Sequence, residues 1–357
     1  MALHIFSKNY PIITLAVVFI SLGILLFSLE RPLAPAKDGS GETEAIQDEP
    51  LNITAGPVSP LTGESCAGAE RRPIGVMLAG DAVTRPLAGI SQADLVIEMP
   101  VITNGITRYL AIFACETPAE IGSVRSARDD FIPLAKGFDV IFGHWGGSHF
   151  ALTELKSGVI DNINALTNPF GAYFRKPGIA EPHNGFATWD KLAAAAQKLD
   201  YRLTTNLKAL WPRHEARAST TKPAATLRVP YPGQFRAAWV YDPKTNTYER
   251  LKGGTPELDA NTKKAVRASV IVVLRTDIKQ IEGQYNDVRV LGKGRGVVYQ
   301  DGEFFEVTWK KADDLEPLQF LTAESTQLPL APGKVWLEYI DDQAAVSYEV
   351  AEATDTL

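Results

Sequence analysis

Residues 11–29 (PIITLAVVFISLGILLFSL) form an uncharged, mainly apolar run between Lys8 and Glu30. The run is nineteen residues long, and a helix of that length, at ~1.5 Å per residue, nearly spans the ~30 Å of hydrocarbon in a bilayer. The flank before it carries Lys8 and no acidic residue, which predicts that the N-terminus stays in the cytoplasm and the rest of the chain crosses. Residues 1–30 are therefore predicted to be a transmembrane helix that anchors an extracytoplasmic body.

A cleaved signal peptide is the alternative to an anchor. Ala34, Pro35 and Ala36 imitate the small-residue pattern of a cleavage site. The apolar core of a usual signal peptide is only ~7–15 residues long, so the longer run favours an uncleaved anchor. No cysteine follows the run directly, so a lipid-modified N-terminus is not indicated.

Residues 31–72 begin with a stretch rich in Pro, Gly, Ser, Thr and acidic residues (RPLAPAKDGSGETEAIQDEP). The segment shows neither helical nor strand periodicity, and such a composition buries too little apolar surface to offset the entropy lost on ordering. It is predicted to be a disordered linker that holds a folded body away from the membrane.

The chain has 357 residues, more than one compact core usually holds, which predicts two folded domains. Its 36 Lys and Arg residues against 42 Asp and Glu residues give a net charge of -6. This balance argues against a nucleic-acid partner, because binding phosphates along a duplex or strand calls for a basic face.

Two cysteines are too few for a disulfide scaffold or a four-thiolate zinc site. Cys66 and Cys115 are nevertheless predicted to face an oxidising compartment. A bridge between them would close a loop of about 50 residues, worth roughly 4 kcal/mol in the chain-entropy model. The alternative is two unrelated thiols, and the distance between them decides.

Residues 73–205 alternate short apolar runs with helical patterns, which predicts an α/β domain built on a mixed sheet. The predicted strands are Ile74–Leu78, Leu95–Met99, Arg108–Phe113 and Val140–Gly143. The predicted helices are Asp129–Lys136, Ser148–Lys156 and Thr188–Leu199, with Ser148 and Thr188 as N-caps.

Residues 206–232 contain several prolines and little periodicity, so they are predicted to link the two domains. Residues 233–345 are predicted to form a smaller β-rich domain, and residues 346–357 a frayed tail. The predicted strands are Ala237–Tyr241, Tyr248–Leu251, Val266–Arg275, Val288–Leu291, Gly296–Gln300, Glu303–Trp309 and Val335–Ile340. The segment GKGR at 292–295 and the pair Asp301-Gly302 are predicted to be the turns between three of them.

The first half contains one dense polar stretch, at Arg108 and at 122–130 (GSVRSARDD). Arg125 and Arg128 are three residues apart, so in a helical turn they lie on one face. Two guanidinium groups beside Ser126 and a helix start are a suitable receptor for phosphate or carboxylate. The alternative is structural, with the arginines in salt bridges to nearby acidic residues.

A glycine-rich turn, His144 to His149 (HWGGSH), follows the strand at 140–143. Ligands often bind in α/β sheets at such a turn, which makes Gly147 and Ser148 candidate ligand-binding residues. Ser148 as a nucleophile is disfavoured because the G-x-S-x-G elbow is absent.

The remaining candidates for chemistry are histidines and acidic residues. His183 and Asn184 lie in a loop, the former as a candidate acid or base with His144. The histidine spacing matches no metal signature, so no metal and no cofactor is predicted. Asp94 and Glu98 are candidate carboxylate partners, although a paired-carboxylate site depends on a separation that the sequence does not show.

The order of these motifs resembles the YerB family of bacterial envelope proteins, often lipoproteins, built from the domain-of-unknown-function family 3048. The matching runs are PLTG (60–63), RPIGVML, TRPLAGISQADLVIE, GITRYLAIF, IGSVRSARDDF, HWGGS, EPHN, AWVYDPKTNTYER, VIVV, GKGRGVVYQDG and PGKVWLEYI. The resemblance covers about residues 60–340 and implies a two-domain extracytoplasmic module without an assigned activity.

The family pattern implies importance for a set of residues in this chain: Arg85, Pro86, Gly89, Asp94, Glu98, Thr107, Arg108, Gly122, Arg125, Ser126, Arg128, His144, Gly147, Ser148, His183 and Asn184. The chain departs from the pattern at His149 and in lacking a lipobox cysteine.

Three functions follow from these residues. The first is binding of an anionic envelope component, such as a phosphorylated glycan or a lipid-linked precursor, by Arg108, Arg125 and Arg128. The second is a hydrolase or transferase acting on the same material, with His144 or His183 as acid or base. The third is a protein-interaction adaptor with structural arginines. Convergence of the arginines, histidines and acids in one pocket would favour the first two.

Overall fold

The computed structural model describes residues 56–102, 105–217, 225–283 and 285–351, all of which belong to one compact unit. The predicted anchor at 1–30 and most of the predicted linker lie outside these residues. Within them, no helix is long and apolar enough to cross a membrane.

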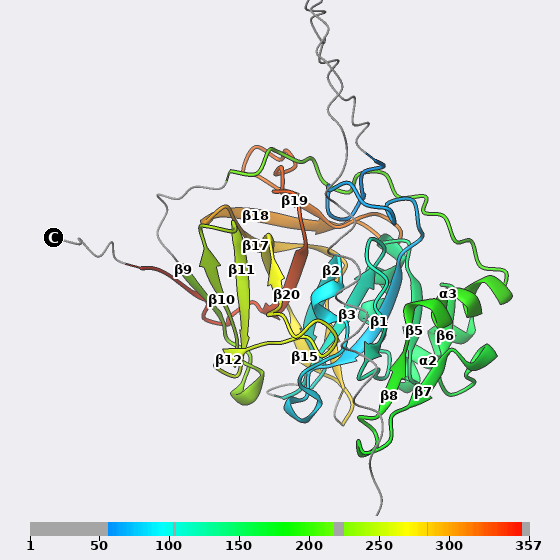
Figure 1. Cartoon of the computed structure of the whole chain (residues 1–357). Helices are drawn as coiled ribbons and strands as arrows, with labels where there is room; N and C mark the ends of the chain where they lie inside the picture. Colours follow the sequence, from blue (N-terminus) through cyan, green and yellow to red (C-terminus); the bar gives the residue numbers. More distant parts are fainter. Residues whose placement is uncertain (1–55, 103–104, 218–224, 284, 352–357) are drawn as a thin grey trace, which may run out of the picture. The chain divides into compact units, whose positions relative to one another are not determined.

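The described residues are rich in strands and contain few helices (Figure 1). The α-helices are α1 (Phe131–Gly137), α2 (His149–Lys156) and α3 (Trp189–Lys198). The strands of the first half are β1 (Ile74–Ala79), β2 (Leu95–Pro100), β3 (Thr107–Phe113), β4 (Ile121–Gly122), β5 (Ile141–His144), β6 (Asn162–Asn164), β7 (Tyr173–Arg175) and β8 (Gly185–Ala187).

The second half is almost entirely β. Its strands are β9 (Ala225–Val229), β10 (Ala237–Asp242), β11 (Thr247–Lys252), β12 (Thr255–Pro256), β13 (Arg267–Ala268), β14 (Val270–Thr276), β15 (Ile278–Gln280), β16 (Asn286–Val288), β17 (Gly292–Gln300), β18 (Glu303–Lys311), β19 (Gln319–Leu321), β20 (Val335–Asp341) and β21 (Ser347–Val350). Short 3-10 turns lie at Ala82–Thr84, Ile90–Gln92, Pro169–Gly171 and Gly233–Phe235.

One mixed sheet runs through both halves of the chain. In the described residues it has ten strands in the order β19-β18-β17-β14-β20-β2-β3-β1-β5-β6. β2 of the first half pairs in parallel with β20 of the second half, and β1 pairs in parallel with β5. The mixed sheet predicted for the first half is therefore present, but half of its strands come from the β-rich second half.

Both faces of this sheet are buried, which explains the continuous apolar runs of its strands. In β3, Leu110 and Ile112 pack into one core with α1, whereas Tyr109 and Ala111 pack into the core on the other face. The second core also takes in α3 and the six-stranded sheet β12-β11-β10-β9-β21, with β13 beside β11.

The helix ends follow the sequence. Ser148 Oγ accepts a hydrogen bond from the backbone N–H of Ala151, and Thr188 Oγ1 accepts one from Lys191. Both predicted N-caps are confirmed, because each side chain satisfies a backbone donor that the first helical turn leaves unpaired.

The described parts of three segments predicted to be unstructured belong to the folded body. In the predicted linker 31–72, Leu61 is fully buried and Cys66 forms a disulfide with Cys115. In the predicted linker 206–232, the indole of Trp211 stacks on Phe320 with ring centres 5.5 Å apart. In the predicted tail, β21 adds to the edge of β9. Their composition predicted no regular structure because the residues that hold them in place lie far away in the sequence.

The turn predicted at 292–295 is wrong. These residues open β17, and Gly292 pairs with Lys311 at the far end of β18. The ladder reaches this far because β18 is nine residues long and gives every residue of the GKGR segment a backbone partner. The predicted Asp301-Gly302 turn is confirmed, with φ of 53° and 72°, as a two-residue hairpin with two left-handed residues requires.

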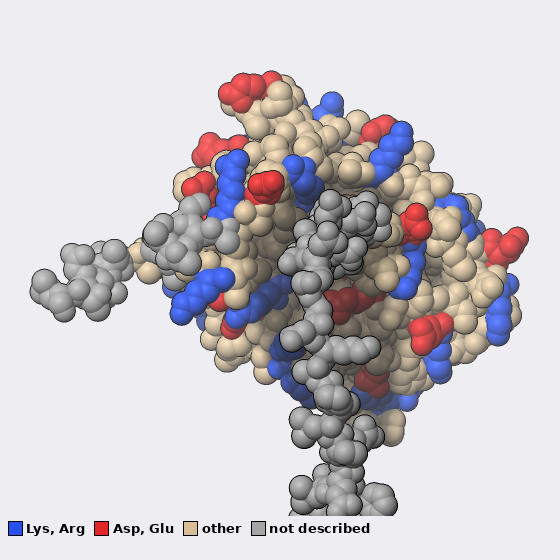
Figure 2. Space-filling view, turned by 45° about the horizontal axis from the view of Figure 1, so that its top comes forward, with Lys and Arg blue, Asp and Glu red and all other residues tan. Residues whose placement is uncertain are grey.

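The surface carries no single-sign field on the face seen in Figure 2, where basic and acidic side chains are interspersed. This mixture agrees with the net charge of -6, and it lacks the basic stripe typical of nucleic-acid-binding surfaces.

Candidate functional site

The segment that carries Arg125 and Arg128 crosses the carboxyl end of β1. The backbone N–H of Arg125 donates to the carbonyl of Met77 at 2.8 Å, and Ala127 forms a parallel bridge with Gly147 in the turn after β5. The segment therefore fills the space between the ends of two parallel strands, the position at which α/β sheets commonly bind ligands.

Arg108 enters the same place from β3, where it pairs with Ala79, the last residue of β1. Its side chain is buried, and Nη1 donates to the carbonyl of Ser126 at 2.7 Å. Arg128 is also buried. Its Nη1 donates to the carbonyl of Ala127 at 2.9 Å, and its guanidinium lies 5.1 Å from the ring centre of Tyr285.

Arg125 is half-buried, and its Nη1 lies 3.2 Å from Nδ1 of His183. Within the described part of the chain, none of these three guanidinium groups forms an ion pair with a carboxylate. The salt bridges that the structural alternative requires are therefore not formed among these residues.

The like charges influence one another. Burial, followed by the charges of Arg128 and Arg125, holds the pKa of Arg108 well below its usual range. Burial is also the main cause of the lowered pKa of Arg128. Positive charge held close together in a partly dehydrated site attracts an anion strongly, because the low local dielectric strengthens each charge interaction.

Several side-chain atoms around these arginines are buried without a hydrogen-bond partner in the protein: Asp81 Oδ2, Arg85 Nε, Arg108 Nε, Ser123 Oγ and Arg128 Nε. Buried polar atoms are nearly always hydrogen-bonded, and each exception costs about 1–3 kcal/mol. A second group of such atoms surrounds the buried Glu98–Arg250 network, so it is their position beside three arginines without ion pairs that marks the end of β1 as the candidate binding site.

The other predicted ligand-binding residues are only partly brought together. Ser126 belongs to the arginine-bearing segment and Gly147 forms a bridge with it, but Ser148 is used as a helix cap and donates to Asp129 Oδ1 at 3.2 Å. Asn184 Oδ1 accepts a hydrogen bond from Arg175 at 2.6 Å. Within the described residues, His183 is the residue of the loop at 181–184 whose side chain contacts one of the three arginines.

His144 does not face the site. It is fully buried, with Nδ1 2.8 Å from the carbonyl of Gly146 and Nε2 3.2 Å from Oδ1 of Asn162. Burial lowers its pKa. Both ring nitrogens are occupied by the protein, so this geometry favours a structural role over the catalytic role predicted for His144.

Asp94 also has a structural position. Its Oδ2 accepts hydrogen bonds from the backbone N–H groups of Ala114 (2.6 Å) and Cys115 (2.9 Å), which holds the chain at the disulfide. Burial raises the pKa of Asp94 to about 6, against the lowering effect of these two hydrogen bonds. Lys334 and Glu116 act on the same carboxyl group and line a neighbouring pocket.

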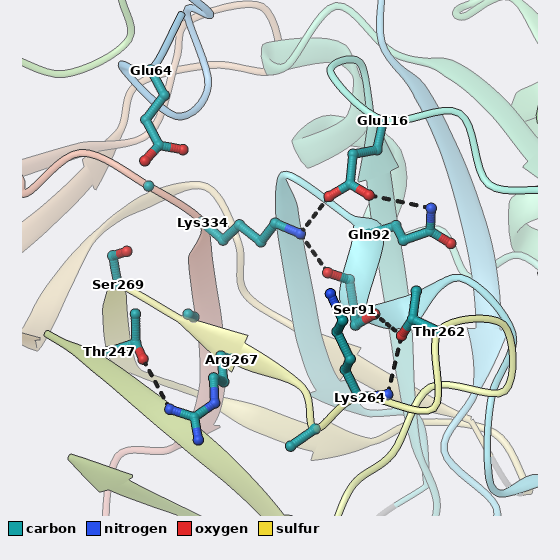
Figure 3. Close-up of a pocket in the computed structure, with 13 residues that line it drawn as sticks. Glu64, Ser91, Gln92, Glu116, Thr247, Thr262, Lys264, Arg267, Ser269 and Lys334 are labelled. Carbon is teal, nitrogen blue, oxygen red and sulfur yellow. Dashed lines mark hydrogen bonds and ion pairs between the residues drawn. The ribbon is translucent and has the colours of Figure 1, made fainter. Parts of the chain in front are cut away.

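That pocket, of about 330 Å³, lies between the two halves of the chain (Figure 3). Lys334 Nζ contacts the carbonyl of Ser91 and a carboxylate oxygen of Glu116, the latter at 2.9 Å. Arg267 is likewise paired, with Glu249 and Asp242. Because Lys334 and Arg267 are already paired with carboxylates, we regard this pocket as a weaker candidate than the arginine site.

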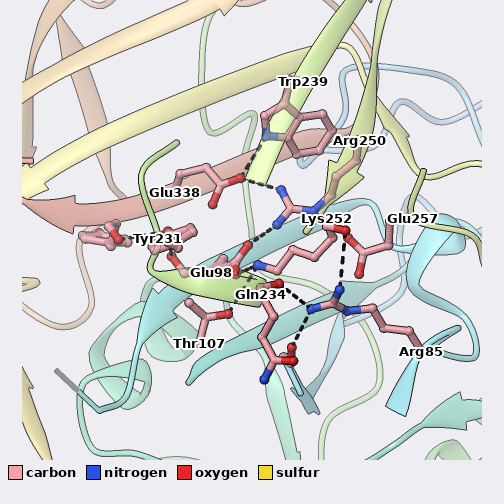
Figure 4. Close-up of polar contacts among 12 residues, drawn as sticks. Arg85, Glu98, Thr107, Tyr231, Gln234, Trp239, Arg250, Lys252, Glu257 and Glu338 are labelled. Atoms are coloured by element: carbon pink, nitrogen blue, oxygen red, sulfur yellow. Dashed lines mark hydrogen bonds and ion pairs between the residues drawn. The ribbon is translucent and has the colours of Figure 1, made fainter. Parts of the chain in front are cut away.

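Glu98 belongs to a sealed network of charges (Figure 4). Its carboxylate pairs with Arg250 and Lys252, and all three side chains are fully buried. Arg250 also pairs with Glu257 at 2.7 Å and with Glu338 at 2.5 Å. The catalytic role predicted for Glu98 is not supported by this geometry, because its oxygens are consumed by two cations and no solvent reaches them.

No group of three or more His, Cys, Asp or Glu side chains suited to a metal ion occurs within the described residues. Sequence reasoning singled out the three arginines and His183 and included Ser123 in the polar stretch around them, but it did not name Asp81 or Tyr285 as site candidates. Asp81 could have been found, because it lies two residues after the end of β1, and ligands often bind at the carboxyl ends of strands in α/β sheets.

Comparison with known proteins agrees with the fold and assigns no activity. Models of the N-terminal and C-terminal domains of DUF3048, described as a protein of unknown function, match residues 61–202 and 227–337. The "Putative lipoprotein YerB" of Bacillus subtilis is 32% identical over 321 residues, which cover 87% of this chain and 93% of that protein.

A crystal structure of the YerB protein from Bacillus subtilis has the same fold, with a TM-score of 0.73 and 31% sequence identity. The similarity covers 81% of this chain and 99% of that one. The chain is a member of the two-domain DUF3048 family, which confirms the resemblance seen in its motifs.

Proposed function

We propose that this protein is an envelope-anchored receptor that binds an anionic component of the cell envelope through Arg108, Arg125 and Arg128. The observation that carries the proposal is the meeting of three arginines at the end of β1. Two of them are buried, and none pairs with a carboxylate among the described residues. A phosphate or carboxylate would supply the missing negative charge and accept from the unpaired Nε–H groups.

The envelope location rests on three further observations. The relative from Bacillus subtilis is named a lipoprotein, which supports an envelope location for this chain as well. The apolar run at 11–29 has the length of a membrane-spanning helix. The Cys66–Cys115 disulfide fits an oxidising compartment. Phosphorylated glycans and lipid-linked precursors are anions found in such a compartment.

An enzyme acting on the bound anion is the second candidate, and one observation favours it. Asp130 is adjacent in sequence to the arginine segment, and burial, followed by the nearby charge of Asp129, raises its pKa to about 8. It lines a hollow of about 300 Å³ with Asp129 and Glu154. A carboxyl group that stays protonated at neutral pH can act as a general acid.

The binding proposal is tested with the full-length protein in detergent micelles at fixed ionic strength. Inorganic phosphate is titrated while thermal unfolding is followed. At ~100 times the dissociation constant, phosphate is expected to stabilise the protein by about 2.7 kcal/mol. Arg125→Gln is expected to remove most of this effect, because it deletes the most accessible of the three guanidinium groups.

Arg228→Gln is the matched control. It removes one positive charge from an exposed position on β9, where Arg228 pairs with the exposed Glu349, and should leave the phosphate effect intact. No stabilisation by phosphate, sulfate or acetate, or equal loss in both variants, would refute an arginine-based anion site. Release of product from a phosphorylated glycan, lost in Asp130→Asn, would instead support the enzyme.

A further inference from the structure

The arginine site contains an acceptor as well as donors. Asp81 begins the loop after β1, and its Oδ2 atom is buried without a hydrogen-bond partner. Ser123 lies on the other side of the same strand end, since its carbonyl accepts from the N–H of Ala79 at 3.0 Å. The hydroxyl of Ser123 is also buried and unpartnered. Ala79 pairs with Arg108, so the backbone positions of all three residues lie at the end of β1.

Asp81 is close to Arg108 without forming an ion pair with it. The negative charge of Asp81 acts to raise the pKa of Arg108, against the stronger lowering effects of burial and the other two arginines. A carboxylate in this position repels a bare anion. It is useful to a ligand only if the ligand presents a hydrogen-bond donor to it, in addition to the anionic group.

A hydroxyl group on the ligand would suit Asp81 better than an ammonium group would. An ammonium group would gain from Asp81 but would be repelled by Arg108, Arg125 and Arg128. A neutral hydroxyl meets no such repulsion, and it can both donate to a carboxylate and exchange a hydrogen bond with a serine hydroxyl. The buried Ser123 hydroxyl provides that second contact.

We propose that the ligand is a hydroxylated phosphate, a polyol or sugar phosphate, and that Asp81 and Ser123 select it by binding a hydroxyl group next to the phosphate. This inference rests on the proposed anion site. In addition to binding phosphate, the site would distinguish phosphate esters by the hydroxyl groups of the esterified alcohol, and Asp81 and Ser123 would be the side chains that distinguish them.

The test is titration calorimetry of the full-length protein in detergent micelles with four probes. These are inorganic phosphate, n-propyl phosphate, glycerol 3-phosphate and O-phosphoethanolamine. Glycerol 3-phosphate and n-propyl phosphate have the same carbon count and differ in the two hydroxyl groups. Glycerol 3-phosphate is expected to bind about 10-fold more tightly, the effect of one hydrogen bond to a charged group. O-phosphoethanolamine is expected to bind no more tightly than n-propyl phosphate.

Asp81→Asn should raise the affinity for the simple phosphates and lower the preference for glycerol 3-phosphate. Loss of the negative charge should tighten binding of inorganic phosphate and n-propyl phosphate, while the preference for glycerol 3-phosphate falls toward 1. Ser123→Ala should reduce that preference without tightening either simple phosphate. Asp190→Asn, at an exposed position on α3, removes the same charge far from these contacts and should change nothing.

The outcomes separate this inference from the proposed function. If phosphate and n-propyl phosphate bind in an Arg125-dependent way but glycerol 3-phosphate binds equally well, the selectivity is refuted and the anion site stands. Parallel weakening of all probes in Asp81→Asn also refutes it, because that result indicates a structural role. If no phosphate binds at all, the anion site fails and the inference fails with it.

Discussion

Arg108, Arg125 and Arg128 hold like charges close together, which costs the ligand-free protein stability. Arg125→Gln removes one source of repulsion without emptying the core, since Arg125 is only half-buried. Its unfolding free energy without ligand is expected to rise by about 0.5 kcal/mol at low salt, and the gain should shrink as salt screens the charges. Denaturant titration at two salt concentrations measures this gain in unfolding free energy, and Arg228→Gln is the control. A loss above 1 kcal/mol would mean that Arg125 supports the fold.

Asp130 should make stability depend on pH. Its folded-state pKa, about 8, is above that of an unfolded aspartate. The stability it contributes is therefore fully present below about pH 4 and is lost as the pH rises through 8. Asp130→Asn keeps the shape of the neutral acid, so its gain over the wild type should grow with pH, by at most about 1.4 kcal/mol per unit. Asp287→Asn, at an exposed neighbour, should show little such growth, and equal slopes in both variants would contradict the assignment.

At single residues, residue type indicates which side chains could bind a ligand but not where they lie. Sequence reasoning singled out Arg108, Arg125 and Arg128 as candidate anion ligands, and the structure brings them to one strand end. Residue type does not distinguish a catalytic from a structural role for His144 and Glu98. Burial and existing hydrogen bonds separate the two roles, and both depend on the folded neighbours.

The strands β2 and β11 are joined by charges that have no access to water. Glu98 serves both Arg250 and Lys252, whereas Glu338 has one oxygen without a partner and a pKa raised mainly by burial. Glu98→Gln should cost about 3–5 kcal/mol, because it leaves buried cations without their counter-charge. Glu338→Gln keeps an acceptor for Arg250 and Trp239 and removes a carboxylate whose charged form is disfavoured by burial, so it should cost less than Glu98→Gln. Denaturant unfolding of both variants at pH 7 measures the contrast, and similar losses would show that both carboxylates are needed as anions.

Elements were predictable where apolar runs are continuous, as in β1, β2, β3 and β14. They were missed where the pairing partner is remote. Residues 347–350 form β21 by pairing with β9, and the segment around Trp211 is held by the stacking of its indole on Phe320. No local pattern at either place indicates structure, because the stabilising contacts form only after the sheet is assembled.

The disulfide attaches the C-terminal part of the predicted linker 31–72 to the chain just after β3 of the main sheet. Cys66 and Cys115 are 49 residues apart with Cα atoms at 5.6 Å. Replacing both by serine should lower the unfolding free energy by about 4 kcal/mol in the chain-entropy model. Alkylation of the protein as isolated from cells should label no thiol before reduction and both afterwards. Labelling of both before reduction would contradict an oxidising location.

The whole molecule should fold as one unit although the family divides it into two domains. β2 lies between β3 and β20, so the first half alone would expose an unpaired strand edge in the middle of the sheet. It would also leave Glu98 buried without Arg250 and Lys252. Residues 56–205 expressed alone are therefore expected to aggregate or to melt without a cooperative transition in circular dichroism, whereas residues 56–357 should melt in one step. A monodisperse fragment with its own sharp transition would show that the first half is an independent domain and that the shared sheet forms by docking.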